Sequence, residues 1–444
     1  MKNKIIIHSP QVKNKNNLIC KFTTTIGIRK FFCNDYFFAE YDRDIDKVHE
    51  SILVIPILAN ILPVAWLYNS DIIVNSLDEN FYNCLEDVKQ AFIKMYPGLK
   101  WRGSISVKYL VNNEMQNNSK SAVLFSCGID SLFSFINHRN ENPYLITVWG
   151  ADIQLFNDEL FKKMIYEIRN FAEFNRIKSL IIKTNFTEFL NQHILYSYFY
   201  EKLPYSWYYS IQHGIGLLGL CAPLAKAENL KNIYIPSTYP SRFIMPCGSS
   251  PELDNSIKWS NINITHDGSE FYRQEKINAI ADYLKTENYR IKIHVCYSDL
   301  RELNCSKCEK CLRTIVGLMA AGLNPNDYGF KISKDTFSLI KNKLLNSNIL
   351  ADKGLLLVWD DIKKNMNMEN IYKMEGSMEF FEWFKNIPLE KYGNKKTNKN
   401  KLSKRFLRKA IKYFYPVFNI IYKILPKEPL YKLYFRYLNK QNSG

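Results

Sequence analysis

The stretch Leu124-Phe-Ser-Cys-Gly-Ile-Asp-Ser-Leu132 decides how the middle of this 444-residue chain folds. Ala122–Phe125 is an apolar run that predicts a short strand, the small residues after it predict a tight turn, and Ser131–Asn137 predicts a helix. In such a unit, backbone N–H groups of the turn and the helix N-terminus attract an anion. The stretch therefore predicts an anion-binding loop at residues 126–131, with a merely connecting turn as the alternative.

The residues downstream of this loop alternate between short apolar runs and helical patterns. The predicted strands are Tyr144–Trp149, Ser179–Lys183, Asn232–Pro236 and Ile291–Val295, and the predicted helices are Asn157–Asn175, Tyr205–Ala227 and Gly268–Thr286. Strands that alternate with helices favour a parallel sheet covered on both faces. The expected fold class is therefore α/β, a Rossmann-like, doubly wound parallel sheet.

The chain also divides into regions of different character. Upstream of the loop, strands are predicted at Asn17–Thr24, Phe31–Tyr41, Ile52–Ile57 and Gly103–Leu110, with a helix at Asn80–Met95. The expected regions are an N-terminal mixed α+β unit (1–115), a nucleotide-binding domain with a cysteine site (116–325), a helical region (326–390) and a basic amphipathic tail (391–444). We expect the N-terminal unit to serve packing or substrate specificity.

Four of the ten cysteines fall within 16 residues, at Cys296, Cys305, Cys308 and Cys311. Cys-x-x-Cys spacing lets two thiolates meet one tetrahedral metal ion across a tight turn, and the other two cysteines complete a closed site. A redox-active pair would need only two of them. The spacing therefore predicts a structural Zn²⁺ site that stabilises the fold and takes no part in the reaction.

The loop resembles the signature Ser-Gly-Gly-x-Asp-Ser of the PP-loop ATP pyrophosphatases, which follows the first strand of a Rossmann-like sheet. Ser126, Gly128, Asp130 and Ser131 match this signature, and Cys127 replaces its first glycine. A Cβ at that position is tolerated if residue 127 takes a negative φ, so we expect a slightly reshaped loop. A nucleophilic role for Cys127 is the weaker alternative, because nothing in the sequence indicates a low thiol pKa.

The loop and the cysteine cluster together are similar to 7-cyano-7-deazaguanine synthase, the nitrile-forming enzyme of queuosine precursor synthesis, over about residues 119–320. The chain departs from that family at Val148-Trp-Gly-Ala-Asp152 and at Tyr239-Pro-Ser-Arg-Phe243, so its substrate is not carried over. As a divergent relative it would bind ATP and Mg²⁺. The resemblance implies attack of a substrate oxygen on the α-phosphate, with AMP and pyrophosphate as products, on the way to an amide or a nitrile.

Site residues follow from the resemblance and from position in the predicted sheet. The expected nucleotide contacts are Ser126, Cys127, Gly128, Ile129, Asp130 and Ser131 in the loop, with Gly150 and Asp152 after the second strand. The expected catalytic residues are Asp130, which would help to hold Mg²⁺, Arg273, which would clamp phosphates or a carboxylate, and Lys183, which follows a strand. A solvated helix start, capped by Asp267, is the alternative for Arg273 and its neighbour Lys276.

The net charge of +17 is distributed unevenly. Residues 391–444 hold 15 Lys and Arg and a single acid, so +14 of that charge belongs to the tail and the body is nearly neutral. Residues 410–425 add apolar side chains at helical spacing. We expect 391–440 to contact a protein partner or an anionic membrane surface, with nucleic acid less favoured, and a small-molecule substrate to bind the body.

The N-terminus and the hydropathy predict a cytoplasmic protein, peripheral to the membrane if the tail binds there. Only Ile5–Ile7 follows Lys2 and Lys4, and no run of about 18 apolar residues occurs. Three function classes stay open. The first is ATP-dependent, AMP-forming activation of a small substrate; the second is a PP-loop tRNA sulfurtransferase, which the neutral body disfavours. The third is a non-catalytic nucleotide-binding component of a defence or assembly system.

Overall fold

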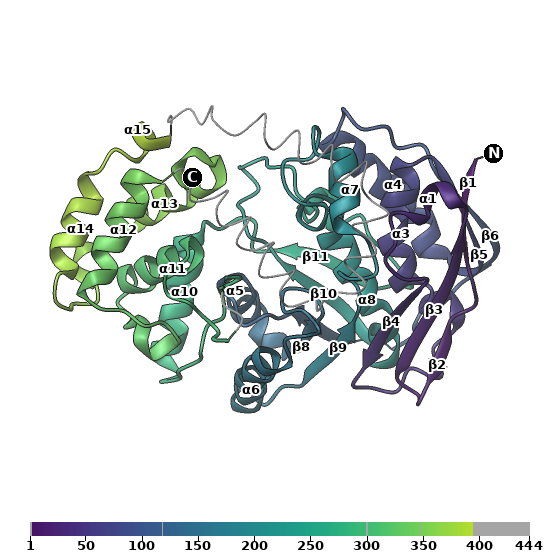
Figure 1. Ribbon diagram of the computed structural model, residues 1–444. Helices are drawn as coiled ribbons and strands as arrows, with labels where there is room; N and C mark the ends of the chain where they lie inside the picture. The colour runs from purple at the N-terminus through teal and green to yellow at the C-terminus, as the bar shows by residue number, and fades with distance from the viewer. Residues whose placement is uncertain (1, 118, 299–300, 348, 394–444) are drawn as a thin grey trace.

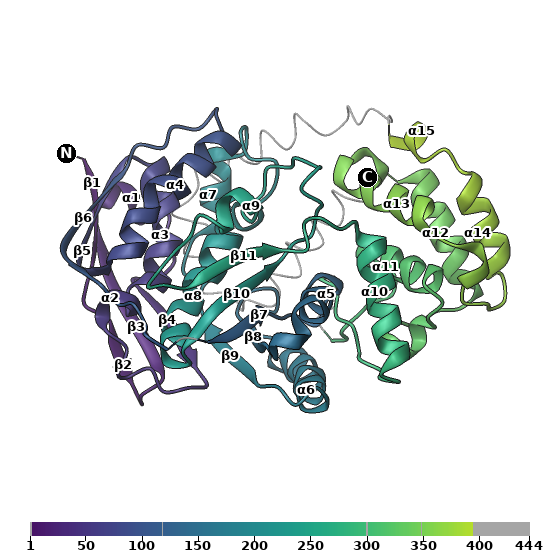
Figure 2. The same cartoon turned by 180° about the vertical axis from the view of Figure 1, so that it is seen from behind.

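The computed structural model describes residues 2–117, 119–298, 301–347 and 349–393. Within these residues an 11-stranded, mostly parallel sheet has the strand order β11-β10-β7-β8-β9-β4-β3-β1-β5-β6, and β2 pairs with β3. The N-terminal strands form one end of the molecule, and the helices that follow residue 273 form the other end (Figures 1 and 2). The predicted tail beyond residue 393 lies outside the described residues.

The central strands are parallel and wind in two directions from β7. They are β7 (Lys120–Leu124), β8 (Tyr144–Trp149), β9 (Ser179–Thr184), β10 (Leu230–Pro236) and β11 (Asn263–Asp267). The chain passes from β7 through β8 to β9, and then returns to place β10 and β11 on the other side of β7. Sheets of this kind bind ligands where the winding direction switches, which here is between β7 and β10. The predicted α/β class, with a doubly wound sheet, is confirmed at this level.

The N-terminal strands extend this same sheet. They are β1 (Asn3–Ile7), β2 (Gln11–Lys13), β3 (Asn17–Thr24), β4 (Tyr36–Tyr41), β5 (Ser70–Asp78) and β6 (Ser104–Val111). The junction is an antiparallel pairing of β4 with β9, in which Glu40 lies opposite Lys183. Residues 1–115 therefore share a sheet with the predicted nucleotide-binding region.

Helices cover both faces of the sheet and bury two separate cores. The first half of the chain contributes α1 (Ile26–Arg29), α2 (Glu50–Leu53), α3 (Ile55–Leu67), α4 (Glu79–Met95), α5 (Ile129–His138), α6 (Asp158–Phe174), α7 (Gln192–Phe199), α8 (His213–Ala227) and α9 (Pro251–Asp254). In β8, Ile146 packs into the core that contains α3 and α8, whereas its neighbour Leu145 packs into the core that contains α5 and α6. Burial on both faces explains why these strands are continuous apolar runs.

The C-terminal part of the described chain is helical, as predicted for residues 326–390. Its helices are α10 (Arg273–Thr286), α11 (Glu309–Ala320), α12 (Lys334–Asn346), α13 (Lys353–Asn365), α14 (Ser377–Asn386) and α15 (Leu389–Gly393). Shorter helical turns occur at Arg139–Glu141, Tyr208–Gln212, Pro325–Tyr328, Ile349–Ala351 and Met368–Asn370. Helix α10 packs on α5 and brings this region to the predicted loop (Figure 1). Across the described residues, no helix has the length and apolar content that a membrane span requires.

The strand predicted at Ile52–Ile57 is wrong, because this segment is helical. It ends α2 and begins α3, in which 12 of the 13 residues are buried. A helix that is apolar on every side shows no 3.6-residue period, so its sequence cannot be distinguished from a buried strand. In the same part of the chain, the strand predicted to begin at Phe31 begins at Tyr36.

Two further predictions near the cysteine cluster are wrong. Residues Ile291–Val295 form no strand, because their backbone bonds to loops: the N–H of Ile293 donates to Tyr328 O at 3.0 Å. The helix predicted from Gly268 begins at Arg273, and Asn263–Asp267 before it is the unpredicted strand β11.

Candidate functional site

The predicted loop leaves the carboxyl end of β7 at the switch point and runs directly into α5. Buried Ser131 organises it: its Oγ accepts the N–H groups of Ser126 at 3.3 Å and of Gly128 at 3.1 Å, and donates to Gly128 O at 3.0 Å. The hydroxyl of Ser131 therefore serves the loop itself, whereas Ser126 is exposed. Because α5 begins at Ile129, the N–H groups of its first turn have no partner within the helix and can meet an anion.

Cys127 takes a left-handed backbone conformation, which glycine adopts more readily than other residues. Its φ is +61°, which corrects the expected negative value, and a non-glycine residue in this left-handed region costs about 1–2 kcal/mol. Its side chain is fully buried, and Sγ donates to Lys292 O at 3.2 Å. Burial raises the pKa of this thiol well above its ordinary value. Cys127 is thus a neutral packed thiol, which weighs against a nucleophilic role.

Asp130 lies between two buried cations from the first turn of α10. Its Oδ2 is 3.5 Å from Arg273 Nη1 and its Oδ1 is 3.7 Å from Lys276 Nζ. Arg273 is 4% exposed and Lys276 1% exposed, and burial lowers the pKa of both while Asp130 opposes that shift. Both cations are also held from the side: Lys276 donates to Ser237 O at 2.6 Å and Arg273 to Thr314 Oγ1 at 3.3 Å. Within the part of the chain that the structure describes, Asp130 is thus the one carboxylate in direct ionic contact with these two fixed cations.

A second pair of cations comes from the first turns of α11. Lys310 Nζ lies 3.7 Å from the centre of the Tyr297 ring; burial lowers its pKa to about 8, and nearby Asp152 opposes that shift. Arg313 is 6% exposed, and its Nε is 3.7 Å from Glu309 Oε1 with no hydrogen bond of its own. Electrostatic coupling links both cations to Asp130, so the two pairs face one region.

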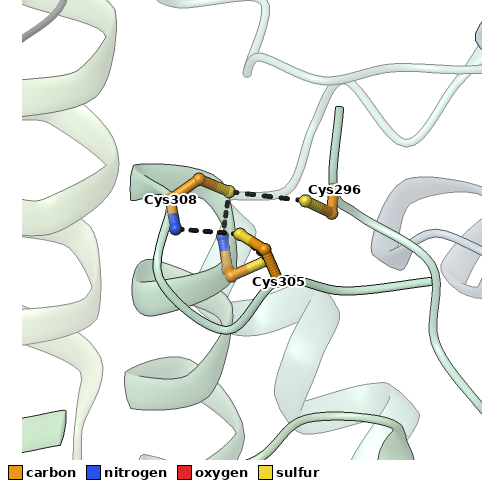
Figure 3. Close-up of side chains that lie close together, drawn as sticks. Cys296, Cys305 and Cys308 are labelled. Atoms are coloured by element: carbon orange, nitrogen blue, oxygen red, sulfur yellow. Dashed lines mark hydrogen bonds between the residues drawn. The ribbon is translucent and has the colours of Figure 1, made fainter. Parts of the chain in front are cut away.

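The four clustered cysteines form a compact centre that can hold a metal ion such as zinc. Their sulfur atoms all lie within 4.8 Å of one another, and Cys305 is 3.9 Å from Cys311. Figure 3 shows Cys296, Cys305 and Cys308 of this centre, with the sulfurs of Cys296 and Cys308 3.8 Å apart. Zn–S bonds of about 2.3 Å in a tetrahedron place sulfurs about 3.8 Å apart, so the centre fits zinc. Backbone N–H groups support the thiolates: Cys308 donates to Cys305 Sγ at 3.1 Å and Ser298 to Cys296 Sγ at 3.3 Å.

The structure places Lys183 away from the loop 126–131 and gives Gly150 a packing explanation. Lys183 lies with Nζ 4.0 Å from Glu40 and 4.8 Å from the centre of the Trp149 ring, two strands away from β7. Gly150 has φ +104°, and a Cβ there would lie 1.9 Å from Thr184 O, so a close backbone approach explains this glycine without a ligand. The predicted site residues that lie near one another are those of the loop 126–131, which include Asp130, together with Asp152 and Arg273.

Replacing Gly150 by alanine should destabilise the protein by about 3 kcal/mol or more, because the new methyl group meets backbone at a left-handed position. Gly98→Ala is the matched control, since its Cβ would meet only the flexible end of Lys202 at 3.6 Å. Urea unfolding measures both variants. Equal stability of the two would show that the approach of Thr184 to Gly150 is not close in solution.

Two basic pairs lie beside the loop, and only the first of them was predicted as a candidate site from the sequence. Arg273 and Lys276, and again Lys310 and Arg313, are basic pairs spaced three apart at the start of a helix. Cations are disfavoured at a helix N-terminus, so a basic pair there indicates a compensating anion. Lys310 lies against the Tyr297 ring and close to Asp152. Thr238 donates from Oγ1 to Asp130 Oδ2 at 3.5 Å. No sequence pattern marks Thr238 or Tyr297 as part of the site.

Asp267 is not the predicted helix cap, because it ends β11 and holds α5 against the sheet. It accepts hydrogen bonds from His138 Nε2 at 2.9 Å, Asn137 at 3.2 Å and Ser134. Burial alone would lower the pKa of His138, but its bonds to Asp267 and Glu141 raise that pKa above the ordinary value. Conversely, burial alone would raise the pKa of Asp267, and the bonds from His138 and Ser134 lower it.

Asp267→Asn should therefore lose stability in a pH-dependent way. The extra stability of wild type over Asp267→Asn needs a charged His138. This stability is fully present below the pKa of His138 in the unfolded chain, about 6.5, and is lost as the pH rises through the raised pKa of His138 in the folded protein. It also needs ionised Asp267, so it falls below about pH 4. Urea unfolding at about pH 5.5 and about pH 8.5 should show the larger gap at the lower pH. The exposed pair of Asp158 and Lys162 supplies a control, Asp158→Asn, with a small gap that does not shrink.

A cavity of about 710 Å³ lies between α6 and the segments around residues 302–304 and 326–331. Its lining includes Lys163, Glu167 and Lys292, and none of the loop residues 126–131. The charged cluster at the loop and this cavity are therefore different features of the molecule.

These observations define a mixed α/β protein with a cationic cluster at the switch point of its sheet and a four-cysteine centre that can bind metal. No protein-family model, no curated protein and no solved structure matches the chain.

Proposed function

We propose that this protein binds ATP on the loop 126–131 and uses it to activate a small substrate, with release of pyrophosphate. One observation carries the proposal. Asp130 of the loop stands between the buried cations Arg273 and Lys276, at 3.5 and 3.7 Å, at the switch point of a doubly wound sheet. Buried cations that exceed the carboxylates beside them favour a multiply charged anion, and the triphosphate of ATP meets that condition.

The proposed step transfers an adenylyl group. A substrate oxygen forms a bond to the α-phosphorus, the bond from that phosphorus to the bridging oxygen breaks, and pyrophosphate leaves with that oxygen. Arg273 and Lys276 would neutralise charge that builds up on the leaving pyrophosphate, and the first-turn N–H groups of α5 would hold the phosphates. Mg²⁺ bound by Asp130 together with the phosphates would supply further charge neutralisation. Attack of ammonia on the adenylate would displace AMP and give an amide. A second adenylation, of the amide oxygen, followed by loss of AMP and a proton would give the nitrile that the family resemblance implies.

The test uses the full chain loaded with zinc, and ATP labelled at the α- or the γ-phosphate. Calorimetry should detect one MgATP bound per chain. With a small-molecule fraction of cell extract as the source of substrate, the labels should appear in AMP and in pyrophosphate. Formation of ADP without AMP would overturn the proposed reaction, and a stimulation that requires tRNA would favour the sulfurtransferase.

ATP binding without turnover under every condition would favour the third class, a nucleotide-binding component of a larger system. Both classes require the loop to bind phosphate, and the φ of +61° at Cys127 is one that glycine adopts without strain. The cysteine therefore does not impose a backbone shape that glycine would avoid, and turnover decides between the two classes.

A further inference from the structure

Cys127 forms hydrogen bonds through its side chain and its backbone carbonyl to the segment that leads into the four-cysteine centre. The Sγ of Cys127 donates to Lys292 O at 3.2 Å, and the N–H of His294 donates to Cys127 O at 2.9 Å. Cys296, the first cysteine of the centre, follows two residues after His294. These two bonds, together with the interaction of the His294 side chain with the backbone of Ser126, connect the loop 126–131 to the segment 291–295.

The segment 291–295 is held by the buried core and by residues of the cysteine centre. Ile291, Ile293 and Val295 are buried in the core. Hydrogen bonds run to Glu167, Tyr328 and Asn304, and the His294 side chain interacts with the backbone of Cys296. Asn304 donates to Ile293 O at 2.6 Å and accepts the N–H of Val295 at 3.1 Å, and it directly precedes Cys305. The segment is therefore fixed at its end by Cys296 and along its length through the neighbour of Cys305. A metal ion that joins these two cysteines fixes both attachments.

We infer that Cys127 is a positioning residue that couples occupancy of the metal centre to the order of the phosphate loop. The inference rests on the proposed function for its consequence, namely that metal-free protein binds ATP weakly, but the coupling itself needs no nucleotide. Glycine, which the resembled signature has here, would adopt φ +61° without strain but has no side-chain donor. Strained backbone of this kind persists where surrounding bonds over-determine it, and the two bonds to 292 and 294 do so.

The coupling is measured by hydrogen exchange of the peptide that covers residues 122–137, in full-length protein with and without zinc. In wild type, removal of zinc should speed exchange in the loop by roughly tenfold or more, while β3 exchanges as before. In zinc-loaded Cys127→Gly, exchange in the loop should already be fast although one zinc is still bound, and removal of zinc should add little. Cys127→Ser restores a donor and should recover part of the protection.

A matched control separates the coupling from the general loss of a buried thiol. Cys221 is equally buried, and its Sγ donates to Leu217 O at 3.4 Å within its own helix α8, so Cys221→Ala should leave exchange in the loop unchanged. Loop exchange that ignores zinc in wild type, or a zinc-loaded Cys127→Gly that matches wild type, would overturn the inference. If metal-free wild type unfolds, as loss of protection in β3 would show, the comparison of the zinc-loaded variants decides. Failure of zinc-loaded wild type to bind MgATP would remove the proposed function without changing the exchange result.

Discussion

Replacing Cys308 by serine should abolish tight zinc binding and lower the melting temperature by roughly 10 °C or more. Structural zinc contributes about 10–16 kcal/mol of folding free energy in small peptides, so the loss of one thiolate ligand should cost several kcal/mol here. The substitution removes a metal ligand without removing the cap of the helix. Cys308 is the N-cap of α11 and accepts the N–H of Cys311 at 3.4 Å, and serine is a preferred N-cap residue. The cap is therefore retained, and the change removes one soft ligand.

The control is Cys247→Ser, which changes a half-buried thiol outside the metal centre. Its Sγ donates to Ser249 O at 2.7 Å, a bond that a hydroxyl can replace, so we expect a change within about 1 kcal/mol. Metal content by mass spectrometry and thermal unfolding with and without a chelator measure both variants. Wild type purified without metal and insensitive to a chelator, or a Cys308→Ser protein with full zinc content and the wild-type melting temperature, would contradict the prediction.

The parts of the fold that were predicted best are a short apolar run and a helix with one apolar face. Strand β8 was predicted with both ends correct because it is a short apolar run, and α4 was predicted within a residue because its apolar face recurs at helical spacing. Helix α3 was missed because it is buried on nearly every side. The pairing of β4 with β9 could not be predicted, since antiparallel contact between strands 140 residues apart leaves no local pattern.

The same limit explains which site residues were found. The loop and the cysteines are local spacings, so both could be located along the chain, and the structure brings them close through segment 291–295. Lys183 was chosen because it follows a strand, but strand order decides which strand ends lie near the loop, and that order is not written locally. Lys310 and Arg313 are close to the loop because α11 packs on α10, which only the tertiary structure shows.

Lys276→Met should weaken MgATP binding by about thirtyfold, corresponding to ~2 kcal/mol for a charge-assisted contact to phosphate, with little change in stability. Lys276 is 1% exposed and lies 3.7 Å from Asp130, so its ammonium is fixed beside the loop. Removal of one partner usually destabilises a buried ion pair, but here Asp130 keeps Arg273 at 3.5 Å, and the cost of desolvating the Lys276 ammonium disappears. The lost bond to Ser237 O works against this gain. A residue that merely supported the fold would show the opposite result, with stability lost and affinity for the nucleotide retained.

Lys285→Met provides the matched control on the same helix. Lys285 lies in the last turn of α10, where its Nζ donates to Ala321 O at 2.8 Å, away from the loop at the other end of the helix. Calorimetry should show that Lys276→Met loses affinity for MgATP and that Lys285→Met keeps it. Urea unfolding should show that Lys276→Met keeps its stability. If Lys276→Met binds MgATP within about threefold of wild type, the buried cations beside Asp130 serve the fold and not a phosphate, and the observation that carries the proposed function is lost.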